Sequence, residues 1–246
     1  MVNNFKLIIE YDGSAYHGWQ RQKNIPTIQG EIENRIRIIT GRQVSVIGSG
    51  RTDAGVHALG QIANFVCDTR LSPEVLLNGL NSLLKKDIVI KDCSFTEQGF
   101  HARYDAKTKT YQYRILSRSV GAAVGRQYEW FIHRKLNIDA VQSAIRHIIG
   151  THDFKAYEGA GSPRASTVRT VMKADLFLKH DGHLFFEIEA DGFLKNMVRN
   201  LVGTLVFVGI GKIEPDRVKE ILLLKDRTRA GPTAPPHGLF LKEVKY

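Results

Sequence analysis

Residues 48–58 read Gly-Ser-Gly-Arg-Thr-Asp-Ala-Gly-Val-His-Ala, and they place one carboxylate, Asp53, in a glycine-rich turn with Arg51 two residues before it. The segments on either side, 44–47 and 61–66, are β-branched or apolar and are bounded by glycine, which predicts a strand on each side of the turn. The glycines allow positive φ and a close approach by another molecule. An acid displayed in such a turn is a candidate for binding or catalysis.

Two ordinary explanations of this stretch compete with a catalytic one. Asp and Gly are common turn formers, so Thr-Asp-Ala-Gly alone is most often a capped turn. A phosphate-binding loop would need a third glycine at the position of Asp53, whose carboxylate would repel an anion. The phosphate-loop hypothesis therefore fails, whereas the capped turn stays open on these residues alone.

The charge of the chain favours a polyanionic partner. The 246 residues include 35 Lys and Arg against 25 Asp and Glu, a formal net charge of +10. Residues 1–104 contain 12 basic and 10 acidic residues, whereas residues 105–246 contain 23 and 15. This asymmetry suggests that a nucleic acid would lie mainly against the second half.

Apolar periodicity and capping residues predict two α+β halves, residues 1–104 and 105–246. Helices are expected where apolar residues recur every three or four positions, at 28–39, from Pro73 through Leu83, and at 137–149, 193–208 and 215–224. Strands are expected at 5–11, 87–95, 109–116, 171–178, 183–190 and 238–244, with a hairpin turn at Asp181-Gly182. Helices gathered on one side of a mainly antiparallel sheet give an α+β fold.

The stretch around Asp53 resembles the catalytic motif of the TruA family of tRNA pseudouridine synthases. The resemblance continues along the chain in the family's order, through Lys109–Arg114, His152–Phe154, Val168–Thr170, Asp191–Leu194, Met197–Asn200 and Ala230–Gly238. It implies two ferredoxin-like (RRM-like) halves whose sheets join, with helices on one side and the active-site cleft on the other. Lys195, Asn196 and Asn64 depart from residues frequent in the family, and Lys195 is a candidate for a phosphate contact.

The resemblance also implies the roles of four residues. Asp53 is the essential catalytic carboxylate, and its route stays open: attack on the base, attack on C1′ or removal of the C2′ proton. Arg51 and Arg199 are expected to keep it ionised and oriented. Tyr111 is expected to stack on the flipped target uridine, whereas the neighbouring Tyr113 is a candidate core residue.

The implied reaction is an isomerisation, so no cofactor is expected, and the nine histidines show no persuasive metal-ligand spacing. His57 is either a general base or a hydrogen-bonded turn histidine. The expected partner is the anticodon stem-loop of tRNA, with targets at about positions 38–40, and the family implies a homodimer.

Two separated cysteines, with no signal segment and no long apolar run, favour a cytoplasmic location without membrane contact.

The loop near 155–166 is either a loop that closes over RNA, with Lys155, Arg164 and the nearby Arg169, or an ordinary connector. The alternative functions are a non-catalytic RNA-binding protein and a nucleoside-bond hydrolase. A hydrolase would need a second acid to protonate the leaving group, and the motifs supply none.

Overall fold

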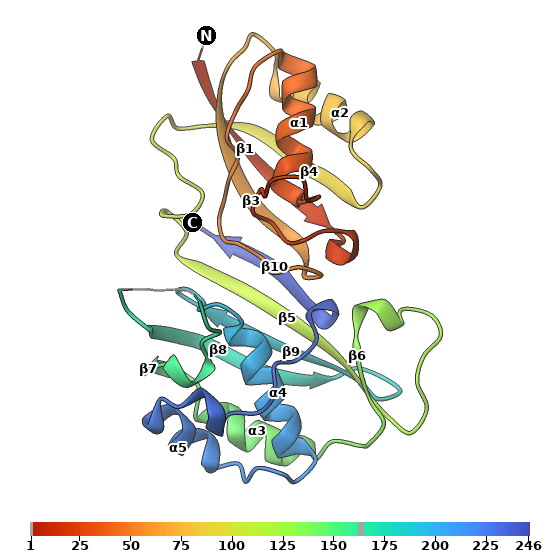
Figure 1. The fold of residues 1–246 in the computed structure, drawn as a ribbon, viewed down its shortest axis with the longest axis vertical. Helices are drawn as coiled ribbons and strands as arrows, with labels where there is room; N and C mark the ends of the chain where they lie inside the picture. The colour runs from red at the N-terminus through yellow and green to blue at the C-terminus, as the bar shows by residue number, and fades with distance from the viewer. Residues whose placement is uncertain (1, 162–164) are drawn as a thin grey trace. The chain divides into compact units, whose positions relative to one another are not determined.

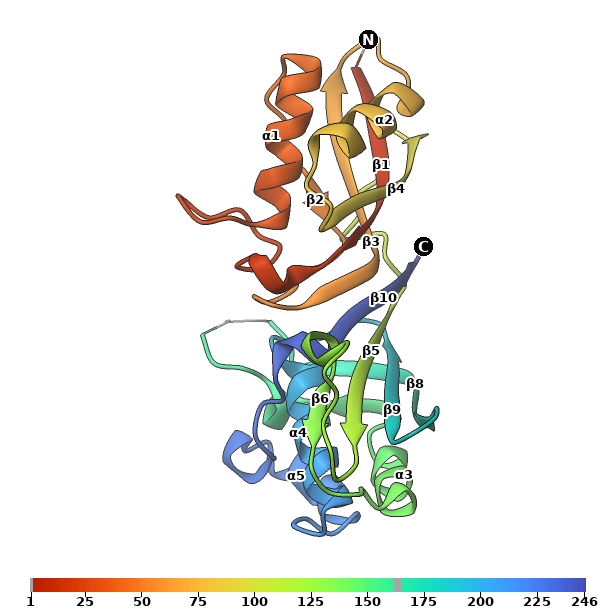
Figure 2. The ribbon, with the colours of Figure 1, turned by 90° about the vertical axis from the view of Figure 1, so that its right-hand side faces the viewer.

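The computed structural model describes residues 2–161 and 165–246 and divides into two compact units (Figures 1 and 2). The first unit comprises residues 1–107 and 240–246, and the second comprises residues 108–239. The chain therefore returns to the first unit with its last strand.

The first unit contains a ferredoxin-like succession of strands and helices. Its elements are β1 (Val2–Tyr11), the 3-10 turn η1 (Gly13–Ala15), α1 (Ile28–Thr40), β2 (Ile47–Gly48), β3 (His57–Asp68), α2 (Pro73–Leu83) and β4 (Ile88–Thr96). Strand β1 lies between β4 and β3, and β2 pairs with β3, all antiparallel. This order is that of the ferredoxin-like fold. The last strand, β10 (Leu239–Lys245), adds a short parallel pairing to β3 at Phe240 and Leu241.

Local sequence signals explain both helices of this unit. Thr27 and Ser72 cap α1 and α2 by accepting hydrogen bonds from the backbone amides of Gly30 and Val75. The apolar faces of both helices are buried, through Ile28, Ile32, Ile36, Leu76 and Leu80. Figure 1 shows α1 and α2 together beside the strands of this unit. Leu83 ends the predicted helix, and its position in the apolar pattern predicts a buried side chain; this prediction is wrong, because the side chain is 41% exposed at the end of α2.

The prediction of a strand over residues 44–47 is also wrong in its extent, because only Ile47–Gly48 pairs with β3. Side chains of α1 instead take the backbone hydrogen bonds of Val46. Its amide donates to Glu33 Oε1 at 2.9 Å, and its carbonyl accepts from Gln29 Nε2 at 3.1 Å. Val46 is therefore buried without being part of a sheet.

The second unit contains a related succession of strands and helices. Its elements are β5 (Thr108–Ser117), β6 (Trp130–Ile132), α3 (Ile138–Arg146), β7 (Gly150–Asp153), β8 (Val168–Leu178), β9 (His183–Ala190), α4 (Met197–Gly209) and α5 (Arg217–Leu224). In this succession β5, α3, β8, β9 and α4 follow one another, with β6, β7 and α5 added. Short 3-10 turns lie at Arg126–Tyr128, Lys155–Tyr157, Arg227–Arg229 and Pro236–Gly238. Strand β9 lies between β5 and β8, and β7 extends the sheet beyond β8, all antiparallel. Only the short strand β6, among the described strands of this unit, runs parallel to its neighbour β5.

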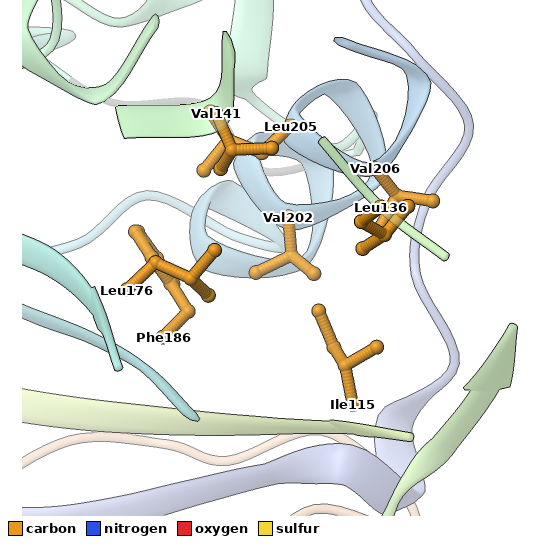
Figure 3. A pocket seen from close by; sticks show the side chains of 8 residues that line it. All are labelled: Ile115, Leu136, Val141, Leu176, Phe186, Val202, Leu205 and Val206. Carbon is orange, nitrogen blue, oxygen red and sulfur yellow. The ribbon is translucent and has the colours of Figure 1, made fainter. Parts of the chain in front are cut away.

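Helices α3 and α4 pack against β5, β8 and β9 to form the core of the second unit. Figure 3 shows Val141, Val202 and Leu205 from the helices facing Ile115, Leu176 and Phe186 from the strands. The cavity that they line is apolar and has a volume of about 10 Å³. That volume is at the lower limit for one water molecule, so the cavity is a packing defect of the core rather than a ligand site.

The α+β fold and the mainly antiparallel pairing are confirmed, with local differences. Asp181 and Gly182 both have positive φ, 48° and 79°, as the predicted hairpin turn requires. Helix α4 begins at Met197 rather than 193, because Asn196 has a left-handed φ of 58°. Helix α3 ends at Arg146, and the short strands β6 and β7 were not predicted. No helix in the described ranges is long and apolar enough to cross a membrane.

Candidate active site

Asp53 lies in the connection between β2 and β3, in a loop of residues 49–56 called the Asp53 loop. The carbonyl of Asp53 accepts the amide of Val56 at 3.1 Å, and Gly55 has a φ of 75°, which only glycine adopts readily. The Asp53 side chain is half-buried, and that of Arg51 is exposed. The predicted glycine-dependent turn is therefore present.

The segment that follows β1 supports this loop from one side. The amide of Trp19 donates to the carbonyl of Thr52 at 3.0 Å, and a Cβ at Gly18 would lie 2.6 Å from the same oxygen. The buried hydroxyl groups of Tyr11 and Thr52 share a hydrogen bond of 2.7 Å. Burial raises the pKa of Tyr11, which keeps its phenol protonated and able to donate. The backbone on the N-terminal side of Asp53 is thus fixed by direct contacts.

Strand β3 supports the loop from the other side. Gln61 is fully buried; its Oε1 accepts the Ser49 hydroxyl at 2.6 Å and its Nε2 donates to the Gly50 carbonyl at 3.0 Å. The Ser49 amide donates to the carbonyl of Ile62 at 2.7 Å. Sequence reasoning missed these supporting residues, although Gln61 lies at the end of the motif that carries the resemblance. A loop held at Ser49, Gly50 and Thr52 presents Asp53 with little conformational freedom.

His57 is a buried histidine that supports the backbone, which agrees with the hydrogen-bonded alternative. Its side chain is 1% exposed and stacks on Phe240 at 4.7 Å between ring centroids. Its Nδ1 lies 3.0 Å from both the Gly13 amide and Asp12 Oδ1. One nitrogen cannot accept from the amide and donate to the carboxylate at once. We assign Nδ1 as the acceptor, because the Gly13 amide is fixed in η1 and can only donate.

In the second unit, Tyr111 and Tyr113 lie two residues apart on β5 and so share one face of the strand. The ring of Tyr111 is 8% exposed and meets Phe193 edge to face at 5.0 Å. Tyr113 is fully buried and donates its hydroxyl to the carbonyl of Pro235 at 2.8 Å. Tyr113 is therefore a core residue, as expected.

Arg199 is half-buried on the first turn of α4. Its Nε donates to the carbonyl of Ala234 at 2.7 Å, and its Nη1 donates to Asn196 Oδ1 at 3.2 Å. These contacts fix the plane of the guanidinium.

Two of the residues that depart from the family pattern contact the backbone. Lys195 donates its Nζ to the carbonyl of Ala160 at 2.8 Å. Asn64 donates to the carbonyl of Phe100 and accepts the amide of Ala102.

The loop near 155–166 contains more structure than expected, because the 3-10 turn Lys155–Tyr157 lies at its beginning, just after the end of β7. Lys155 pairs with Glu158 at 2.7 Å, and Arg169 donates to the carbonyl of Ser166 at 3.2 Å. Arg164 lies outside the described residues. Within the described ranges, no group of three or more His, Cys, Asp or Glu side chains could hold a metal ion.

A family model described as tRNA pseudouridine synthase matches residues 7–105 and 144–246. The chain belongs to the tRNA pseudouridine synthase family. The matched ranges contain the Asp53 loop and α4 and leave out residues 1–6 and 106–143, the latter including Tyr111.

Full-length relatives agree with the family model. The chain is 49% identical to a protein named tRNA pseudouridine synthase A from Thermoanaerobacter sp. (strain X514), with 100% of both chains covered. It is 46% and 45% identical to proteins of the same name from Acetivibrio thermocellus and Clostridium acetobutylicum, again over 100% of both chains. A solved Cbf5-Nop10-Gar1 complex covers 82% of this chain and 45% of its own, at 11% identity and a TM-score of 0.37, a likeness too weak to carry an argument.

Proposed function

We propose that this protein is a tRNA pseudouridine synthase that isomerises uridines of the anticodon stem-loop, at about positions 38–40, without a cofactor. The proposal rests on one observation: the chain belongs to the family and aligns over its full length with relatives named for this activity. The non-catalytic RNA-binding alternative is not favoured, because those relatives carry an enzyme's name. The stem-loop positions rest on the resemblance of the motifs around Asp53.

The reaction needs no redox partner. The C1′–N1 bond of uridine breaks, the base turns, and a C1′–C5 bond forms; C5 then loses a proton to solvent and N1 gains one. Atoms and electrons balance within the nucleotide, so one ionised carboxylate beside the sugar suffices. Water must be excluded while the base is detached, because hydrolysis would otherwise release uracil.

Asp53 is the carboxylate in this proposal, and the rigid Asp53 loop supports that role. Arg51 lies two residues away in the same loop, and the family resemblance pairs Arg199 with the same carboxylate. A guanidinium offers a planar fork that orients a carboxylate as well as keeping it charged.

Tyr111 is the stacking platform for the target uridine. A uridine in a stem leaves its stack at a cost of a few kcal/mol, and contact with an aromatic ring recovers part of it. The edge-to-face contact with Phe193 holds the Tyr111 ring in a defined orientation. The excess of basic residues in 105–246 would contact the phosphates of tRNA, and a homodimer acting in the cytoplasm completes the proposal.

The experiment is to incubate the protein with unmodified tRNA and to map the products by carbodiimide labelling and primer extension. Pseudouridine at positions 38–40 with no free uracil is the expected result. Pseudouridine elsewhere in the tRNA would overturn the assignment of the stem-loop but keep the reaction. Free uracil would indicate the hydrolase, and bound but unmodified tRNA would indicate the binding protein.

A further inference from the structure

The orientation of Arg199 depends on residues 230–234, called the clamp segment. Arg199 and Ala234 form two reciprocal contacts: the Ala234 amide donates to the Arg199 carbonyl at 3.1 Å, and Arg199 Nε donates to the Ala234 carbonyl at 2.7 Å. Any displacement of Ala234 along α4 would therefore turn the guanidinium.

A polar network centred on the buried side chain of Asn200 holds the clamp segment next to Arg199. Asn200 is 0% exposed; its Oδ1 accepts the Thr233 hydroxyl at 2.7 Å and Arg227 Nη2 at 3.0 Å. The same Nη2 donates to Thr233 Oγ1 at 3.1 Å, and Nη1 donates to the Gly231 carbonyl at 2.9 Å. The amide group of Asn200 is itself fixed, since its Nδ2 donates to the carbonyl of Tyr157 at 2.8 Å. Burial lowers the pKa of Arg227, yet a guanidinium stays charged at neutral pH.

Close backbone packing restricts the movement of the same segment. A Cβ at Gly203 would lie 1.7 Å from the Pro232 carbonyl oxygen, and one at Gly231 would lie 2.7 Å from the Gly203 oxygen. The Gly231 amide donates to Thr204 Oγ1 at 2.9 Å. The clamp segment thus lies directly on the α4 backbone, where a small shift cannot be absorbed.

We propose that Thr233, Asn200 and Arg227 are positioning residues that set the Arg199 guanidinium through the Ala234 carbonyl. The inference rests on the proposed function, in which Arg199 orients the catalytic carboxylate. None of the three is assigned to contact the reacting atoms. Their effect on the reaction is exerted through geometry, and a misplacement of ~1 Å in a catalytic group costs up to about 10²-fold in rate.

Thr233 offers the mildest test, because its side chain is exposed and its hydroxyl is the direct link to Asn200. Thr233→Val removes the hydroxyl and keeps the shape, whereas Thr233→Ser keeps the hydroxyl. We expect the single-turnover rate on tRNA to fall about tenfold in Thr233→Val, a fraction of the cost of full misplacement. The tRNA dissociation constant should stay unchanged, and Thr233→Ser should retain the wild-type rate. Equal rates in both variants would overturn the proposal.

A double-mutant cycle separates positioning from a general structural effect. If Thr233 acts through Arg199, Thr233→Val should cost no further rate in an Arg199→Ala background. Losses that simply multiply would overturn the proposal, because they would mean that Thr233 acts independently of Arg199. Arg227→Lys, which keeps the charge but loses the planar fork, should behave like Thr233→Val.

Hydrogen exchange at Arg199 tests the positioning network without relying on enzymatic activity, so it can be tested separately from the proposed function. The hydrogen-bonded Nε–H of Arg199 should exchange slowly with solvent in the NMR spectrum, with Arg199→Lys identifying its signal. Thr233→Val should accelerate that exchange and Thr233→Ser should not. Unchanged exchange in Thr233→Val would overturn the positioning network, whereas an inactive wild type with the expected exchange pattern would refute only the proposed function.

Discussion

Gly203→Ala tests the packing of the clamp segment by the sign of its effect on stability. Gly203 lies inside α4, where replacing glycine by alanine normally stabilises a helix by about 1 kcal/mol. The added Cβ would, however, lie 1.7 Å from the Pro232 carbonyl oxygen and 2.8 Å from its carbon. Both are backbone atoms, so the contact is relieved only by moving the segment off the helix.

The expected change is a net destabilisation of about 2 kcal/mol. Overpacking costs typically ~1–3 kcal/mol, and an overlap with backbone belongs at the upper end of that range, about 3 kcal/mol. Subtracting the gain of about 1 kcal/mol in helix propensity leaves the net value. Urea denaturation followed by circular dichroism measures it. The turnover of Gly203→Ala should also fall, because the displaced segment carries Ala234 and with it the contact to Arg199.

Gly79→Ala is the matched control, because Gly79 also lies inside a helix, α2. Its added Cβ would meet the end of the flexible Ile39 side chain at 3.1 Å, which can move aside. We expect this variant to match or exceed the wild-type stability, by up to about 1 kcal/mol, with unchanged turnover. A Gly203→Ala protein as stable as Gly79→Ala would refute the close packing of the clamp segment.

Three further substitutions test separate parts of the account. Tyr11→Phe removes the hydrogen bond to Thr52 and should lower stability by about 1 kcal/mol in urea denaturation; because the Asp53 loop loosens, its turnover should fall while tRNA binding is kept, and an unchanged rate would contradict the supporting role. Tyr111→Phe keeps the ring that is proposed to stack on the uridine, so tRNA affinity should be unchanged, and a loss of affinity would contradict the stacking role. Val202→Ala enlarges the apolar cavity and should cost about 2 kcal/mol of unfolding free energy; a neutral effect would mean that the core around it collapses freely.

The sequence predicted those elements whose signals are local. Ser72 and Asn137 cap their helices by accepting the backbone amides of Val75 and Ala140, and these caps are recognisable from the residue types alone. The hairpin at Asp181-Gly182 is another local signal. Periodicity and capping depend on neighbours along the chain, so a single sequence is sufficient to predict them.

What could not be predicted depends on contacts between distant segments. Val46 looks like a strand residue, but Gln29 and Glu33 on α1 take its backbone hydrogen bonds. The left-handed conformation of Asn196 shortens α4 by four residues at its start, although the apolar spacing continues through them. Conformations of this kind are decided by tertiary packing rather than by local propensity.

The candidate site divides in the same way. The turn at Asp53 follows from its glycines, whereas its support by Tyr11 depends on a residue 41 positions away. Likewise, the hydroxyl of Thr233 donates to Oδ1 of Asn200, which is 33 positions away in the sequence. Neither segment contains a local signal that predicts this hydrogen bond. The sequence therefore identified the chemical groups, and the structure adds what holds them.

The most direct test of the central claim measures tritium release from tRNA labelled at uridine C5, with wild type and Asp53→Asn compared at equal tRNA binding. Asn keeps the size of Asp53 and removes only its charge, so the Asp53 loop and tRNA affinity should be preserved. We expect release by the wild type and none by Asp53→Asn. Release by both would contradict the role of Asp53, and release by neither, with tRNA still bound tightly, would contradict the enzyme itself.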